Sequence, residues 1–217
     1  MLPLFKGGFF MQDFLTSTLG QIIVVVSIIV LLIVIFKTSK KDNKNNVKAL
    51  TYSAIAIAIA FVLNAFIVFK MPQGGSATLF SMLVIVLIAY WFGPKNGILA
   101  GLAFGLLNAM YQPFIVHPMQ FLLDYPLAFG MLGVAGFFRN KKHGLQWGYI
   151  VAVLGRYVCH VMSGIIFFAE YAGDSNVILY SIIYNASYIG IEAIITFALL
   201  WVPGVRNAFS RIKTNLN

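Results

Sequence analysis

The chain has 217 residues, of which 60% are hydrophobic and only 10% are charged, and its formal net charge is +9. Its mean hydropathy is +0.90, whereas soluble domains carry about 25% charged residues. This composition excludes a soluble protein and predicts an integral membrane protein embedded in a lipid bilayer.

The apolar runs predict seven membrane-spanning helices, because a span needs about 20 mostly apolar residues. These helices are expected at residues 20–36, 49–69, 77–92, 96–112, 120–138, 147–169 and 178–202. The first could be a signal sequence, since it lies near the N-terminus and follows Lys6. Its long apolar core, the missing small-residue cleavage site and the positive charge after it favour a retained anchor.

The polar stretch KTSKKDNKNNVK, residues 37–48, is the best candidate for a linker. It divides the chain into an N-terminal anchor with a basic cytoplasmic linker, residues 1–48, and a six-helix membrane domain, residues 49–217. The other connections are short, and FGPKNG has the Gly and Pro of a tight turn.

Basic residues gather in alternate loops, which the positive-inside rule assigns to the cytoplasm. They are Lys37, Lys40, Lys41, Lys44, Lys48, Lys95, Arg139, Lys141, Lys142, Arg206, Arg211 and Lys213. The opposite loops hold only Lys6 and Lys70, so the N-terminus is expected outside and the C-terminus in the cytoplasm. This topology accounts for the net charge, and no nucleic-acid partner is inferred from it.

Acidic residues are distributed in the opposite way. Those near outer helix ends or in outer loops are Asp13, Asp124, Glu170 and Asp174. A site on this acidic outer face would favour a cation or a neutral polar ligand over an anion. Scattered loop acids are more often only solvated, so the bias by itself does not define a site.

Four ionisable residues fall inside predicted spans, and they are Asp124, Arg156, His160 and Glu192. Such groups are costly in a bilayer, so each marks a candidate functional site. Arg156, His160, Gly164 and Phe168 are spaced four apart, which puts them on one helix face. Gly164 would allow close approach of a ligand, and Phe168 would offer a flat stacking surface.

Arg156 and Glu192 lie at a similar depth, roughly 18 Å from the outer end at about 1.5 Å per residue. We therefore expect them to form a structural ion pair between the last two helices, outside the ligand site.

The last helix also carries a stripe of Tyr180, Tyr184 and Tyr188 with Asn185 beside it. The stripe could equally be an interfacial aromatic belt or core packing. The Asn185 amide, in contrast, needs a hydrogen-bonding partner in the outer half of a span.

Several enzyme and metal sites lack support. A hydrolase needs a nucleophile, a base and an oxyanion hole, and Ser163 is expected on a different helix face from His160. His117, His143 and His160 share no loop or face, so no metal site is predicted. The sequence has no P-loop motif for binding ATP.

Four segments stand in a characteristic order: GGSATLFSMLVIVLIAYWFGPKNGILAGLAFGLLNAM, HPMQFLLDYPLAFGMLGVAGFF, GRYVCHVMSGIIFFAEYA and YSIIYNASY. In order and spacing they resemble the thiamine-specific substrate-binding (S) subunit of energy-coupling-factor transporters. The resemblance covers roughly residues 49–203. It implies an all-α integral membrane protein with a six-helix S-component core, to which this chain adds one N-terminal transmembrane helix.

The resemblance also implies thiamine as the ligand, no cofactor, and a place in the bacterial cell membrane. Its partners would be a transmembrane coupling protein and two cytoplasmic ATPase subunits. The implied ligand-binding residues are Asp124, Tyr125, His160, Gly164, Phe168, Tyr180, Asn185 and Phe104. Positions 104 and 168 are Trp in some members, and the loop after Tyr171 has no Trp, which puts the strength of stacking or the form of the vitamin in question.

The chemistry of thiamine agrees with this set. Its permanently charged thiazolium needs a carboxylate and aromatic faces, and its flat aminopyrimidine needs amide or imidazole groups. Asp124 is therefore expected to be the counter-ion of the ligand. The alternative is that Asp124 only caps the N-terminus of its helix ahead of Pro126.

Small residues in the first helix of the six-helix domain are spaced so that another helix could approach closely. They are Ala54 with Ala58, and Ala56 with Ala60. By resemblance this face meets the coupling protein, and the alternative is packing inside the bundle.

The sequence thus predicts a high-affinity thiamine-binding subunit of an importer that catalyses no reaction itself. Two alternatives stay open. The ligand could be a related vitamin or a thiamine precursor such as the pyrimidine moiety, or the chain could be an intramembrane enzyme using His160 and Asp124.

Overall fold

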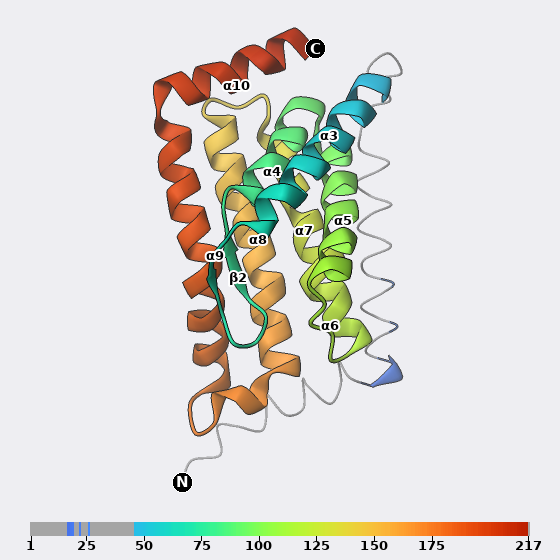
Figure 1. Cartoon of the computed structure of the whole chain (residues 1–217), viewed down its shortest axis with the longest axis vertical. Helices are drawn as coiled ribbons and strands as arrows, with labels where there is room; N and C mark the ends of the chain where they lie inside the picture. Colours follow the sequence, from blue (N-terminus) through green and yellow to red (C-terminus); the bar gives the residue numbers. More distant parts are fainter. Residues whose placement is uncertain (1–16, 20–21, 23–25, 27–45, 217) are drawn as a thin grey trace.

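The structure is a computed structural model that describes residues 17–19, 22, 26 and 46–216. Most of the predicted first helix, residues 20–36, and most of the linker lie outside the described residues. In the described part, helices pack side by side into a bundle (Figure 1). The all-α membrane class is confirmed, while the number of spans and the division after residue 48 stay predictions.

Two long helices, α8 (Gly144–Phe167) and α9 (Val177–Trp201), lie against each other along one side of the bundle. The other side holds α3 (Asn46–Ala65), α4 (Ser81–Phe92) and α5 (Pro94–Tyr111). Four described segments are long and apolar enough to cross a membrane: Val47–Ala65, Pro118–Phe138, Gly144–Phe167 and Val177–Trp201. The apolar α4 is shorter, with 12 residues.

The segment between α3 and α4 differs from the prediction that helices end at residue 69 and start at residue 77. It forms an antiparallel hairpin of β1 (Ile67–Lys70) and β2 (Ser76–Thr78), with Lys70 opposite Ser76. Pro72 and the glycine pair after it provide the turn, and Gly74 has a φ of 83° that glycine adopts readily. Pro72, Gly74 and Gly75 interrupt a stretch of mostly apolar residues, and this turn signal is short enough to be missed in a hydropathy pattern.

The segment Pro118–Phe138 is helical throughout but changes pitch along its length. It consists of α6 (Pro118–Leu122), the π-helical turn η1 (Leu123–Leu127), α7 (Ala128–Gly130) and the 3-10 helix η2 (Met131–Phe138). Pro126 lies inside η1, where its missing N–H interrupts regular α-helical bonding.

A helix that the sequence did not predict, α10 (Pro203–Leu216), lies across one end of the bundle (Figure 1). The Trp91 indole N–H donates to the carbonyl of Phe209 at 3.1 Å, and Lys213 binds the backbone carbonyl of Arg139. The basic loops after α4 and η2 therefore lie at the α10 end. The hairpin loop, α6 and η3 (Ala169–Ala172) lie toward the other end.

The four alanines of α3 do not share one environment. Ala54 and Ala58 are exposed, whereas Ala56 and Ala60 are buried within the bundle. Ala56 packs in a cluster that includes Leu216 of α10. The prediction that all four face a partner is wrong for Ala56 and Ala60, because α3 turns their side of the helix toward its own neighbours.

Close backbone contact between α5 and the Pro118–Phe138 segment depends on glycine. A Cβ atom on Gly101 would collide with the backbone carbonyl of Phe129, and one on Gly105 would collide with that of Tyr125. Small residues are what allow helices to approach so closely in a membrane. This contact sets the position of the segment that carries Asp124.

We expect Gly101→Ala to destabilise the protein, because one of the two backbones must move to admit the methyl group. The expected loss is about 1–3 kcal/mol, the usual cost of overpacking. Thermal unfolding in detergent would measure it. Gly190→Ala on α9 is the matched control, since its Cβ would meet nothing within 4 Å. Equal melting temperatures for the two variants would contradict the packing argument.

Candidate functional site

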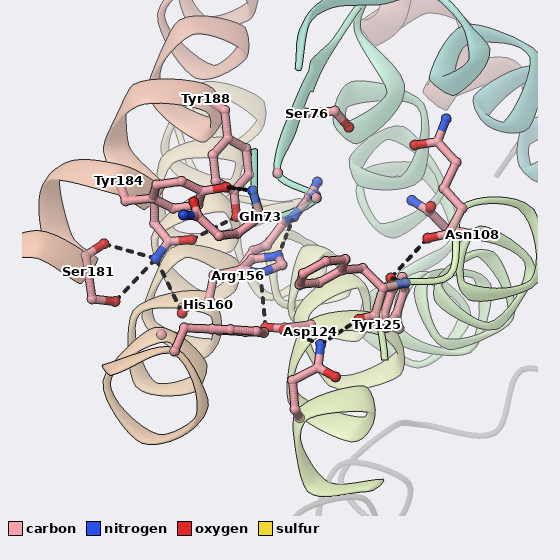
Figure 2. A pocket seen from close by; sticks show the side chains of 18 of the residues that line it. Gln73, Ser76, Asn108, Asp124, Tyr125, Arg156, His160, Ser181, Tyr184 and Tyr188 are labelled. Carbon is pink, nitrogen blue, oxygen red and sulfur yellow. Dashed lines mark hydrogen bonds and ion pairs between the residues drawn. The ribbon is translucent and has the colours of Figure 1, made fainter. Parts of the chain in front are cut away.

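A cavity lies between the hairpin loop, the loop before α6, and helices α8 and α9 (Figure 2). The space between its lining residues is about 820 Å³, including open solvent at its mouth. Seven of the eight predicted ligand-binding residues line it: Asp124, Tyr125, His160, Gly164, Phe168, Tyr180 and Asn185.

The Asp124 carboxylate is bound by side chains from its own segment and from α8. Its Oδ1 lies 3.1 Å from Nδ1 of His160. Its Oδ2 accepts hydrogen bonds from Gln120 at 2.6 Å and from Ser163 at 2.8 Å. The Asp124 side chain keeps 13% of its surface exposed, so the carboxylate is held in place while part of it remains accessible.

The alternative role for Asp124, capping the start of its helix, is wrong. The helical segment begins at Pro118, and its N-terminus is capped by His117, whose Nδ1 accepts from the Met119 N–H at 3.1 Å. Asp124 lies further along the segment, in η1. Its side chain points toward α8 and the cavity (Figure 2).

Ser163 lies on the same side of α8 as His160, which corrects the expectation that they occupy different faces. Residues three apart in a helix are neighbours, and both side chains reach Asp124. The Ser163 hydroxyl, however, donates to the carboxylate and not to the imidazole. The arrangement therefore lacks the serine-to-histidine hydrogen bond of a nucleophilic triad.

Arg156 belongs to the cavity and not to the predicted ion pair with Glu192. Its guanidinium lies 4.1 Å from the centre of the Phe129 ring, and its Nε donates to Nε2 of His160 at 3.4 Å. Because Nε2 accepts this bond, the imidazole is assigned a proton on Nδ1, the nitrogen that lies 3.1 Å from Oδ1 of Asp124. Among the described residues, Glu192 bonds instead to groups at the end of β2 and the start of α4.

Phe104 is the predicted residue that does not reach the cavity. It is fully buried behind the wall, and its ring meets Phe129 edge-on with centroids 4.9 Å apart. Phe129 lines the cavity in its place. The close approach of α5 to the Pro118–Phe138 segment explains the difference, because it leaves Phe104 facing that segment.

The polar side chains of α9 are engaged within the wall. The Asn185 amide donates to the backbone carbonyl of Ser181 at 2.9 Å and to that of His160 at 3.3 Å. Its Oδ1 accepts from the Tyr188 hydroxyl at 2.7 Å. The expected partner for this amide therefore exists. Tyr180, Tyr184 and Tyr188 all line the cavity, so the stripe is more than an interfacial belt.

The rim of the cavity consists of two loops that the sequence analysis did not identify. The hairpin loop contributes Gln73 to Ser76, and the backbone N–H of Gln73 donates to the Tyr184 hydroxyl at 3.1 Å. The loop before α6 contributes Gln112 and Phe114. The glycine pair between two polar residues was the available signal for the first loop.

Tyr125 holds the second loop in place. Its hydroxyl accepts from the Phe114 N–H at 2.8 Å and donates to the Gln112 carbonyl at 3.0 Å. The Phe114 ring then lies 5.8 Å from that of Phe168. The two rings form an aromatic surface over the cavity, beside Gly74 of the hairpin loop.

Comparison with known sequences gives one family and two related proteins. Residues 50–210 match the family model described as Thiamine transporter protein (Thia_YuaJ). The Thiamine transporter ThiT of Bacillus subtilis is 36% identical over 151 residues, covering 63% of this chain and 77% of that protein. The protein of the same name from Lacticaseibacillus paracasei is 24% identical over 141 residues, covering 57% of this chain and 70% of that protein.

A solved structure gives the same fold. It is that of ThiT from Listeria monocytogenes, with a TM-score of 0.62 and 24% sequence identity. The match covers 73% of this chain and 97% of the solved chain.

We expect Tyr125→Phe to loosen the loop before α6, because two backbone groups lose their partner. Hydrogen–deuterium exchange of residues 112–117 should accelerate roughly tenfold, as expected when a hydrogen bond worth about 1–1.5 kcal/mol is lost. Tyr111→Phe is the matched control, since that tyrosine is exposed at the end of α5, directly before the same loop. Unchanged exchange in Tyr125→Phe would contradict the anchoring role.

Proposed function

Because this chain belongs to the thiamine transporter protein family, a family of membrane proteins for thiamine uptake, we propose that it is the thiamine-capturing S-component of an energy-coupling-factor importer. It would bind the vitamin at the outer face of the cell membrane. Partner ATPases would then drive its release inward. The observation that carries the proposal is the cavity that holds Asp124 among aromatic and amide side chains.

Asp124 is proposed as the counter-ion of the thiazolium. The Asp124 side chain is partly exposed to the cavity, and Gln120 and Ser163 bind the carboxylate through an amide and a hydroxyl, which carry no charge. A cationic ligand beside it would be attracted by the carboxylate, and this attraction would offset the free-energy cost of removing the cation from water. The rings of Phe168 and Phe114 supply flat surfaces for cation–π contact.

The aminopyrimidine would be recognised by the polar groups deeper in the cavity. Arg156 has N–H groups beyond the Nε that binds His160, and they can donate to ring nitrogens. Asn185 retains an acceptor position on Oδ1 for the amine. Tyr180 offers its hydroxyl at the cavity wall.

The proposed orientation follows from charge. The basic loops lie at the α10 end, which the positive-inside rule assigns to the cytoplasm. The hairpin loop, which lines the cavity, lies toward the other end. We propose that this end faces outward, on the side where the sequence predicts the N-terminus. The exposed side of α3 with Ala54 and Ala58 is the proposed contact with the coupling protein.

The alternatives have less support. A thiamine precursor such as the pyrimidine moiety could use the polar groups but would leave Asp124 without a cation. An enzyme acting through His160 and Asp124 would need an activated nucleophile, and Ser163 is bonded to the carboxylate instead.

We expect purified protein to bind thiamine saturably, and Asp124→Asn to raise the Kd by roughly ten- to a hundredfold, as for a lost charge-assisted interaction. Fluorescence titration would measure both. Asp174→Asn, the same change on an exposed loop, should leave the Kd unchanged.

The neutral pyrimidine moiety provides a second comparison. Asp124→Asn should weaken its binding much less than that of thiamine if the carboxylate is a counter-ion. Equal losses for both ligands would refute that role, and an absence of thiamine binding by folded wild-type protein would refute the proposed function.

The partner contact is tested separately. Replacing both Ala54 and Ala58 with Leu should greatly reduce co-purification with the coupling protein and ATPases, because the added side chains block close helix approach. Thiamine binding should persist. Ala186→Leu, on the exposed side of α9, is the control. Undiminished co-purification of the double variant would exclude this face.

A further inference from the structure

Glu192 is a buried acid that the proposed binding site does not use. It is 4% exposed and lies on α9. Its carboxylate accepts from the Thr78 hydroxyl at 2.8 Å, the Met82 N–H at 3.0 Å and, more weakly, the Ser81 hydroxyl at 3.4 Å. All three donors belong to the junction between β2 and α4.

This junction lacks a cap of its own. Helix α4 begins after Phe80, whose side chain makes no capping hydrogen bond and whose φ of 61° is unusual for a residue with a side chain. The Met82 N–H is one of the donors left without a partner at a helix start. Glu192 supplies the missing acceptor from another helix.

Two features favour a buried carboxylate here, the charge of Arg156 and the start of α4. The N-terminus of α4 presents unpaired N–H groups and a partial positive charge, and both stabilise an anion. The Thr78 hydroxyl donates to the carboxylate. The Ser81 hydroxyl lies 2.7 Å from that of Thr78 and 3.4 Å from the carboxylate, so it shares its one proton between these two acceptors. Removing the carboxylate would take the acceptor from the Met82 N–H and leave the two hydroxyl groups bonded only to each other.

The position of Glu192 links this cap to the cavity. Thr78 follows Ser76 by two residues, and Ser76 lines the cavity on the hairpin side. Glu192 follows Tyr188 by one helical turn, and Tyr188 lines the cavity on the α9 side. The two lining residues belong to surfaces that already touch, since Gly75 packs against the Tyr188 ring.

We propose that Glu192 is a positioning residue that clamps the β1–β2 hairpin to α9 and so keeps the hairpin loop over the cavity. The time for which a ligand stays bound then depends on this clamp. That second statement rests on the proposed function, whereas the clamp itself does not.

The first test compares hairpin opening without ligand. Hydrogen–deuterium exchange should accelerate roughly tenfold in residues 71–82 of Glu192→Gln and Thr78→Val, the scale expected for a lost hydrogen bond to a charged group. Thr196→Val is the control, because it removes a buried hydroxyl one turn from Glu192 that is not among the donors to the Glu192 carboxylate.

Exchange elsewhere distinguishes a clamp from general stability. Residues 94–111 and 144–167 should exchange as in the wild type. Uniform acceleration throughout the chain, or unchanged exchange in residues 71–82, would overturn the proposal. If Glu192→Gln does not fold, Thr78→Val decides the question. It removes the hydrogen bond from Thr78 to Glu192 and keeps the one from the Met82 N–H to the carboxylate.

The second test follows thiamine dissociation by stopped-flow fluorescence. The dissociation rate should rise roughly tenfold in Glu192→Gln and Thr78→Val and stay unchanged in Thr196→Val. An unchanged rate despite faster hairpin exchange would overturn the link to ligand retention. Failure of the wild type to bind thiamine would refute the proposed function, while the exchange experiment would still decide whether the clamp exists.

Discussion

The carboxylate of Asp124 lies among helices whose other contacts are mostly apolar, and an anion there is stable only if donors surround it. Gln120 from its own segment and Ser163 and His160 from α8 meet that need. These bonds join two helical segments at the depth of the cavity. The further bond from Arg156 to His160 orients the imidazole, so His160 connects the acidic and the basic side chain that line the cavity.

The two buried acids are stabilised by different means and have different consequences. Asp124 is bound by side chains and stays partly open to the cavity, which suits an acid that meets a cation. Glu192 is enclosed by hydroxyl groups and a helix start, which suits an acid that fixes structure. In both cases the carboxylate connects elements that are distant in the chain. In this protein, each buried carboxylate therefore links two helical segments through hydrogen bonds.

Glycine contacts complete the arrangement from the apolar side. Gly101 and Gly105 let α5 touch the backbone of the Pro118–Phe138 segment, and this sets where Asp124 and Tyr125 lie. Tyr125 then holds the loop before α6, while Glu192 holds the hairpin. The cavity thus has a rigid wall built on close packing and a rim built on a few hydrogen bonds.

The sequence by itself determined the membrane class, the approximate ends of most helices and the shared face of Arg156, His160, Gly164 and Phe168, because hydropathy and helical periodicity are local properties. It also identified the family, through segments that keep their order and spacing. Only the tertiary structure decided that Phe104 lies behind the wall, that Ala56 and Ala60 face inward, and that Glu192 bonds to α4 and not to Arg156. Each of these depends on which surfaces of distant segments meet, and the hairpin depends on a turn whose signal was hidden among apolar residues. Periodicity along one helix carries no information about which distant groups that helix will meet.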